Sequence, residues 1–160
     1  MSRMARRVLI PAFVIFAMGV YGQTMKSDHW STADLQERAK HLQELAAKSD
    51  GSASETLEQY PHHYTMLAFR QHSGGGELHQ HFADIFYILE GRASVLTGGR
   101  LIEQKESGPG EIRGKAVEGG SRQELKAGDV VHIPAGMPHQ MLVAEGESIT
   151  YYVVKVEESR

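Results

Sequence analysis

The sequence has no cysteine among its 160 residues. This absence excludes disulfide bonds, cysteine-ligated zinc sites and thiol catalysis. An excess of charge of either sign is also missing, because 17 basic residues are set against 20 acidic ones for a net charge of −3. Such a balance provides neither a basic surface for nucleic acid nor an acidic tail. We therefore expect no nucleic-acid partner.

The apolar run at residues 8–20 is short for a membrane-spanning helix, which needs about 20 residues. Three arginines precede it within residues 1–7, and small residues follow it up to Gly22. This order of charged, apolar and small segments is typical of a secretory signal peptide. We predict a signal peptide over residues 1–22 and an exported, periplasmic or extracellular protein, with no stable membrane insertion after cleavage. An uncleaved N-terminal anchor and a buried helix are the alternatives.

One amphipathic helix is predicted between Ser31 and Lys48, within an N-terminal segment of residues 23–55. Its apolar residues recur at helical spacing and form one stripe: Leu35, Ala39, Leu42 and Ala46. Ser31 followed by Asp34 resembles a capping box, and Ser49-Asp50-Gly51 ends the helix. We expect the stripe to pack on the outside of the following domain and residues 49–55 to form a polar linker.

The remainder of the chain, residues 56–160, has the pattern of an all-β domain. Seventeen glycines punctuate short segments of strand-forming residues, which we predict at 64–69, 85–89, 93–97, 129–133, 140–143 and 149–156. Residues 105–121 contain five glycines and are interpreted as a long loop, with a short strand at 111–113. Many short strands separated by turns indicate a sandwich or barrel.

Nine histidines raise the question of a metal site, since imidazole is the commonest metal ligand. His79 and His81 share a face if they lie in one strand, and Asp84 follows shortly after. His139 comes after a rigid turn containing two prolines. Three imidazoles and a carboxylate suit Fe, Mn, Ni, Cu or Zn better than Ca or Mg. We predict one divalent transition metal ion on His79, His81, Asp84 and His139, with positions open to water or substrate; a barrel without metal is the alternative.

These segments resemble the two motifs of the cupin superfamily. The first motif, a glycine, a His-x-His pair, a Glu and a later glycine, is matched by Gly76, His79-Gln80-His81, Asp84 and Gly91. The second motif, G-x5-P-x-G-x2-H-x3-N, is matched by Gly128, Pro134, Gly136 and His139. The carboxylate is Asp84 and follows His81 after two residues, where the family has three or four. Val143 replaces the terminal Asn.

The resemblance covers about residues 60–156 and implies a cupin double-stranded β-helix, a jelly-roll-like barrel with the metal inside, and often a homodimer. For function it favours a metal-dependent oxidoreductase or dioxygenase acting on a small molecule. A metal-dependent isomerase or lyase, and a non-catalytic module that binds or senses a small ligand, remain open. Glu77 has the same strand parity as His79, so we expect a general base, a support for the ligands or a rim residue there. His132 is expected in the core or the barrel lining.

Overall fold

The helix begins where the capping residues predict it. In the computed structural model, which describes residues 27–158, α1 spans Thr32–Ala46. The Asp34 amide donates to the Ser31 hydroxyl at 3.2 Å, and the Ser31 amide donates to the Asp34 carboxylate at 2.9 Å. Such a reciprocal cap satisfies two N–H groups at the helix start and is worth about 1 kcal/mol. The predicted capping box is confirmed, whereas the predicted signal peptide at residues 1–22 lies outside the described residues.

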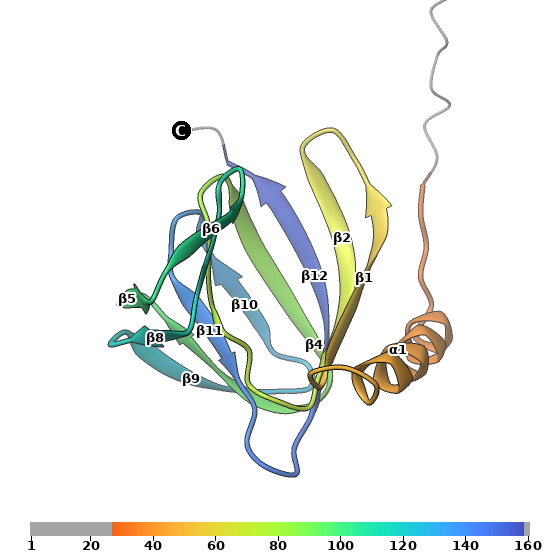
Figure 1. Ribbon diagram of the computed structural model, residues 1–160. Helices are drawn as coiled ribbons and strands as arrows, with labels where there is room; N and C mark the ends of the chain where they lie inside the picture. Colours follow the sequence, from red (N-terminus) through yellow and green to blue (C-terminus); the bar gives the residue numbers. More distant parts are fainter. Residues whose placement is uncertain (1–26, 159–160) are drawn as a thin grey trace, which may run out of the picture.

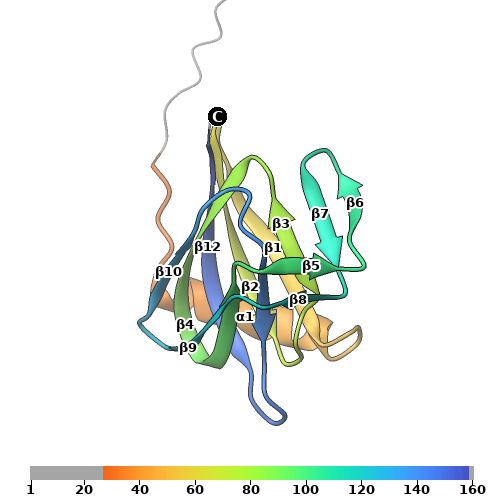
Figure 2. The same ribbon diagram turned by 90° about the vertical axis from the view of Figure 1, so that its left-hand side faces the viewer.

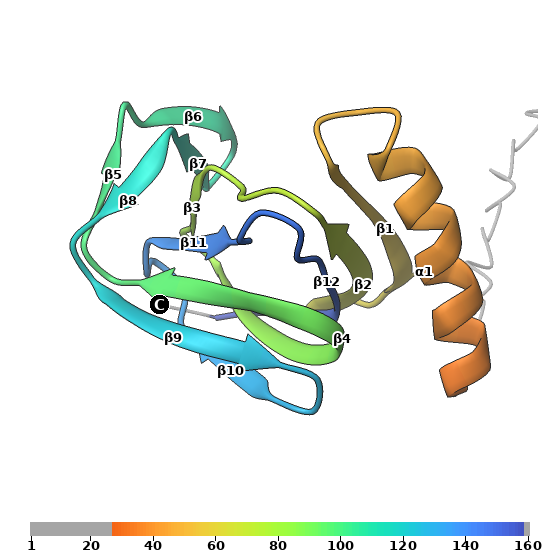
Figure 3. The ribbon, with the colours of Figure 1, turned by 90° about the horizontal axis from the view of Figure 1, so that it is seen from below.

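The apolar stripe of α1 packs against the outer face of the sheet. Ala39, Leu42 and Ala46 are buried there against Leu67 and Phe69 of β2. Burying one large apolar side chain stabilises a fold by about 1.5–3 kcal/mol, so this contact fixes the helix. Seen from below, α1 runs along β1 and β2 on the outside of the barrel (Figure 3). Within the described part of the chain, no helix has the length and apolar character to cross a bilayer.

Twelve strands follow the helix in residues 27–158, and all their pairings are antiparallel. They are β1 Ser52–Gln59, β2 His63–Arg70, β3 Gly76–His79, β4 Phe82–Thr97, β5 Arg100–Ile102, β6 Lys105–Gly108, β7 Glu111–Gly114, β8 Ala116–Glu118, β9 Ser121–Lys126, β10 Val130–Ile133, β11 His139–Leu142 and β12 Ile149–Glu157. Ten of them form one sheet in the order β1-β2-β12-β4-β11-β3-β7-β6, with β9 and β10 also paired to β4. The sheet curls into a barrel (Figures 1 and 2), which confirms the predicted all-β class.

Strand β4 bends at Gly91 and serves both halves of the barrel. Its first half pairs with β10 and β12, and its second half pairs with β9 and β11. Gly91 has a φ of 82°, and a Cβ atom there would collide with the Ser148 carbonyl oxygen. Only glycine fits this backbone without strain. The two strands predicted at 85–89 and 93–97 are therefore one bent strand, because Glu90-Gly91 is a bend within a ladder and not a turn.

Two predictions about polar segments and one about His132 are wrong. Residues 105–121 are not a long loop: the strand predicted at 111–113 is present as β7, but β6 and β8 lie there as well, with a tight turn at Gly110. The expected linker at 49–55 already contains the start of β1 at Ser52. Both segments lie at the ends of the strand order and are largely polar, so they lack the apolar alternation from which strands are predicted. His132 is exposed on β10 and lines neither the core nor the cavity.

Candidate metal centre

Strands β3 and β11 bring two imidazoles together inside the barrel. Glu77 and His139 are register partners across these strands, which places His139 beside β3, two residues along that strand from His79. The rings of His79 and His139 lie 5.2 Å apart between centroids. Their residues are 3% and 4% exposed. Two histidines sixty positions apart in the sequence therefore meet in a buried site.

Each imidazole is oriented by a partner on its Nδ1 atom. His79 Nδ1 lies 2.6 Å from Glu111 Oε2, and His139 Nδ1 lies 3.1 Å from the Met137 carbonyl oxygen. Since both partners are acceptors, we assign a proton to Nδ1 in both rings, so that Nε2 is the atom left to bind a second proton or a metal ion. Both Nε2 atoms are buried and make no hydrogen bond to the described residues. Such orphaned atoms cost about 1–3 kcal/mol each unless something binds them, and backing on Nδ1 is how metal-binding histidines are held.

Two carboxylates approach these Nε2 atoms. Asp84 Oδ2 lies 3.4 Å from His79 Nε2 and 3.5 Å from His139 Nε2. Glu77 Oε2 lies 3.6 Å and 3.9 Å from the same two nitrogens. Ligand atoms of Glu77, His79 and His139 all lie within 4.8 Å of one another. A set of imidazole nitrogens and carboxylate oxygens of this size is compatible with a divalent transition metal ion.

His81 is not brought into this cluster, and Glu77 is. Strand β3 ends at His79, and the Gln80 amide donates to the Gly110 carbonyl oxygen at 2.8 Å in the bend that follows. The two-residue alternation of side chains stops there, so His81 is exposed. Of the four predicted ligands, His79, Asp84 and His139 lie together and His81 lies apart, whereas Glu77 joins the group. With Glu77 and His79 as the pair, four residues separate His79 from Asp84, which is the spacing of the family motif.

The Glu77 carboxylate is ionised, and two arginines hold one of its oxygens. Its Oε1 atom forms an ion pair with Arg113 Nη1 at 2.5 Å and accepts a hydrogen bond from Arg70 Nη2 at 3.3 Å. Burial raises the pKa of Glu77, but His79 and the charges of Arg113 and Arg70 outweigh burial and lower it to about 2. A carboxylate with so low a pKa is a weak proton acceptor at neutral pH. The expected role as general base is therefore less favourable than the ligand role that its Oε2 position offers.

Asp84 is paired with a buried lysine that was not anticipated. Asp84 on β4 and Lys155 on β12 are register partners, and Lys155 Nζ donates to Asp84 Oδ1 at 2.5 Å. Burial raises the pKa of Asp84, but His79 and Lys155 outweigh burial and lower it. The sequence did contain a signal for Lys155: it shares strand parity with Tyr151 and Val153, so it is an inward-facing charge in an otherwise apolar strand.

The two imidazoles differ in their affinity for a proton. Burial lowers the pKa of His79, but its interactions with Asp84 and Glu77 outweigh burial and raise it to about 9. For His139, burial prevails and the pKa is lowered. A positive charge at the centre of the cluster is therefore favoured, and it is favoured most at His79.

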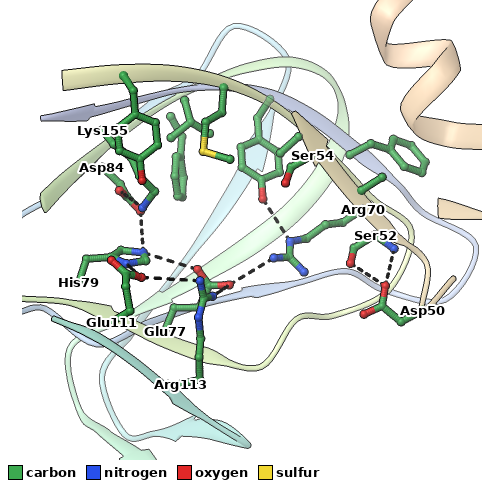
Figure 4. Close-up of a pocket in the computed structure, with 18 of the residues that line it drawn as sticks. Asp50, Ser52, Ser54, Arg70, Glu77, His79, Asp84, Glu111, Arg113 and Lys155 are labelled. Atoms are coloured by element: carbon green, nitrogen blue, oxygen red, sulfur yellow. Dashed lines mark hydrogen bonds and ion pairs between the residues drawn. The ribbon is translucent and has the colours of Figure 1, made fainter. Parts of the chain in front are cut away.

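A cavity of about 710 Å³ opens beside the cluster. Figure 4 shows Asp84, His79 and Glu77 near one end of it and Asp50 and Ser52 at the other. Arg70 stands between them and donates through Nε to the Tyr151 hydroxyl at 3.1 Å. Further lining residues are Ser54, Tyr64, Met66, Ala68, Phe86, Glu111, Arg113, Val153 and Lys155. The space suits a small molecule with polar groups.

The sequence matches no family model and no curated protein. Among solved structures, the cupin domain of Schizosaccharomyces pombe Cnp3 superposes with a TM-score of 0.51 over 69% of this chain and 67% of that chain, at 12% identity. Bacillus halodurans BH2720 gives a TM-score of 0.51 over 74% of this chain and 79% of its own, at 18% identity. Thermus thermophilus TT1209 gives 0.50 over 69% and 87%, at 17% identity. At these identities the likeness concerns the fold.

Proposed function

Given that the chain has the cupin fold, we propose that it is a metal-dependent enzyme acting on a small molecule, of the oxidoreductase or dioxygenase type. The observation that carries this proposal is the pair of buried, unpartnered Nε2 atoms of His79 and His139 within the described residues, which face the carboxylates of Glu77 and Asp84. Two histidines and one carboxylate with open positions are the ligand set of non-haem iron oxygenases.

We assign Glu77, His79 and His139 as the residues that hold the ion, with Asp84 as a further carboxylate facing both imidazoles. The candidate ions are Fe, Mn, Ni, Cu and Zn. A bound ion of this kind would supply Lewis acidity and, for a redox-active metal, electron transfer.

The surrounding residues keep this ligand set in place. Glu111 and the Met137 carbonyl fix the two rings, so that each Nε2 atom faces the cluster. Arg70 and Arg113 hold Oε1 of Glu77 and leave Oε2 toward the imidazoles. Phe86 packs its ring 6.4 Å from that of His139 and covers the site with apolar surface. This arrangement orients the ligands and excludes water from one side of the site.

The alternative functions are not equally supported. Isomerase or lyase chemistry with Glu77 as the proton carrier is disfavoured, because its pKa of about 2 keeps the carboxylate ionised. A non-catalytic module that binds a small ligand remains the second candidate, since the cavity of about 710 Å³ serves binding as well as turnover.

Metal analysis and oxygen uptake of the purified protein test the proposal. We expect about one iron or manganese ion per chain, and oxygen consumption with members of a panel of phenols and diketones. Zinc with tight retention of a ligand and no turnover would favour the binding module. Protein without stoichiometric metal after supplementation with each candidate ion would contradict the metal-dependent enzyme.

We also propose that the protein is exported, from the order of segments in residues 1–22 alone. The test is N-terminal sequencing of the protein from separated cell fractions. A chain beginning at Gln23 in the periplasm or medium is expected, whereas Met1 in the membrane fraction would indicate an uncleaved anchor. The homodimer implied by the cupin resemblance is a proposal of the same kind, and light scattering of the purified protein tests it.

A further inference from the structure

Among the described residues, Arg70, Arg113 and Lys155 line the cavity, and both arginines contact the protein's own acidic or phenolic groups. Arg70 donates to Tyr151 through Nε and to Glu77 through Nη2. Arg113 directs Nη1 to Glu77 and Nη2 to Glu111, at 2.5 Å and 3.7 Å. Both guanidinium groups are therefore positioned by the protein's own side chains.

The Lys155 ammonium has N–H groups that make no hydrogen bond to the described residues. Its ammonium carries three N–H groups, and its one hydrogen bond to the described residues is the one to Asp84. The side chain is 11% exposed and lines the cavity. Burying an ammonium costs free energy unless its donors are hydrogen-bonded. A molecule in the cavity that offers acceptors to the remaining N–H groups of Lys155 would therefore be stabilised there.

Tyr64 stands next to Lys155 on the neighbouring strand. The two residues are register partners between β2 and β12, and both line the cavity. The Tyr64 ring packs edge-on against Phe82 with centroids 5.5 Å apart, and its hydroxyl makes no hydrogen bond to the described residues. Burial, together with the charges of Glu111 and Asp84, raises the pKa of Tyr64 to about 12. The hydroxyl is therefore protonated and able to donate.

We propose that Lys155 and Tyr64 together bind a carboxylate or other oxyanion of the substrate, beside the candidate metal centre. The ammonium supplies charge and the phenol a second donor, which together make a charge-assisted pair of hydrogen bonds. The inference rests on the proposed function for its biological meaning and narrows the substrate to a small acid. It concerns a binding contact that the metal ligands themselves do not make.

Trifluoroacetate is a suitable probe, because its binding is followed by ¹⁹F line broadening. Titrations use metal-free and zinc-saturated protein, with neutral trifluoroethanol as the uncharged control. We expect Tyr64→Phe to weaken trifluoroacetate binding by about fivefold and Lys155→Met by about tenfold. The matched controls Tyr87→Phe and Lys105→Met change exposed residues and should bind as the wild type does.

Lys155→Met leaves Asp84 as an unpaired buried charge, so a second variant guards against loss of folding. Asp84→Asn combined with Lys155→Met keeps the net charge and, in the metal-free protein, should also lose about tenfold in affinity. Wild-type affinity in both Tyr64→Phe and the double variant would overturn the proposal and direct attention to Arg70 and Arg113. Equal binding of trifluoroacetate and trifluoroethanol would overturn it as well. If zinc is not taken up, the proposed function fails, and the metal-free titration still decides this inference.

Discussion

Glu111 on β7 accepts a hydrogen bond from the Nδ1 atom of His79 on β3 at 2.6 Å. The two residues are register partners in these neighbouring strands. This contact decides which nitrogen of His79 faces the carboxylates. Glu111→Ala should therefore weaken metal binding by about tenfold or more, since outer partners of metal-binding histidines have effects of this size. Competition with a chelator measures the affinity. Glu106→Ala on β6 is the control, because Glu106 is exposed. Equal affinities in the two variants would contradict the role of Glu111.

The ligand set is tested by four single alanine variants. His79→Ala and His139→Ala should lose most of the metal, because each removes one of the two orphaned Nε2 atoms. His81→Ala and His132→Ala should retain it, because both side chains are exposed. Elemental analysis of the purified variants gives the occupancy. Loss of metal in His81→Ala equal to that in His79→Ala would restore the histidine pair first predicted from the motif.

The buried Lys155–Asp84 pair is expected to matter for stability. Lys155→Met removes one partner and leaves the 2%-exposed Asp84 carboxylate without its counter-ion. Breaking a buried pair in this way costs about 3–5 kcal/mol. Denaturant unfolding of the metal-free protein measures the loss. Asp84→Asn in the same chain should recover part of it, and Lys105→Met should leave the free energy of unfolding nearly unchanged. An unchanged midpoint in Lys155→Met would argue against the pair.

The raised pKa of His79 predicts how the metal-free protein responds to pH. Its folded value of about 9 lies above the ordinary value of 6.5, so protonation of His79 stabilises the folded state. This stabilisation is fully present below about pH 6.5 and is lost as the pH rises through about 9. Unfolding of wild type and His79→Gln between pH 6 and 10 checks it. The wild type should lose more free energy of unfolding than His79→Gln as the pH rises through about 9. Parallel curves for the two proteins would contradict the prediction.

The sequence predicted best what local chemistry decides. The cap of α1 needs only Ser31 and Asp34, three residues apart, and β12 is rich in β-branched and aromatic residues that fit a buried strand. Strand β7 was predicted at 111–113, but its hairpin partner β6 was missed because the residues of β6 are polar and carry no alternation. The hairpin also depends on the pairing of β7 with β3, which no local pattern reveals.

The same dependence on distant pairing explains why His81 was predicted beside His79 and is found apart from the cluster. By strand alternation alone, His79 could share a face with Glu77, with His81 or with both. Which of these neighbours points into the barrel depends on where β3 ends. That end is set by a hydrogen bond from Gln80 to Gly110, thirty positions away. The spacing from His79 to Asp84 was the available clue, since it matches the family motif only when Glu77 is the first member of the pair.

The bend of β4 at Gly91 also sets the dimensions of the site. Asp84 lies in the first half of this strand, and Thr97 at its far end is the register partner of His139. One continuous strand thus fixes the distance between the Asp84 carboxylate and the His139 imidazole, which belong to different halves of the barrel. An inserted or deleted residue within β4 would change that separation directly. A residue inserted or deleted at Gly110 would act on the site indirectly, through the Gln80–Gly110 hydrogen bond and the contact of Glu111 with His79.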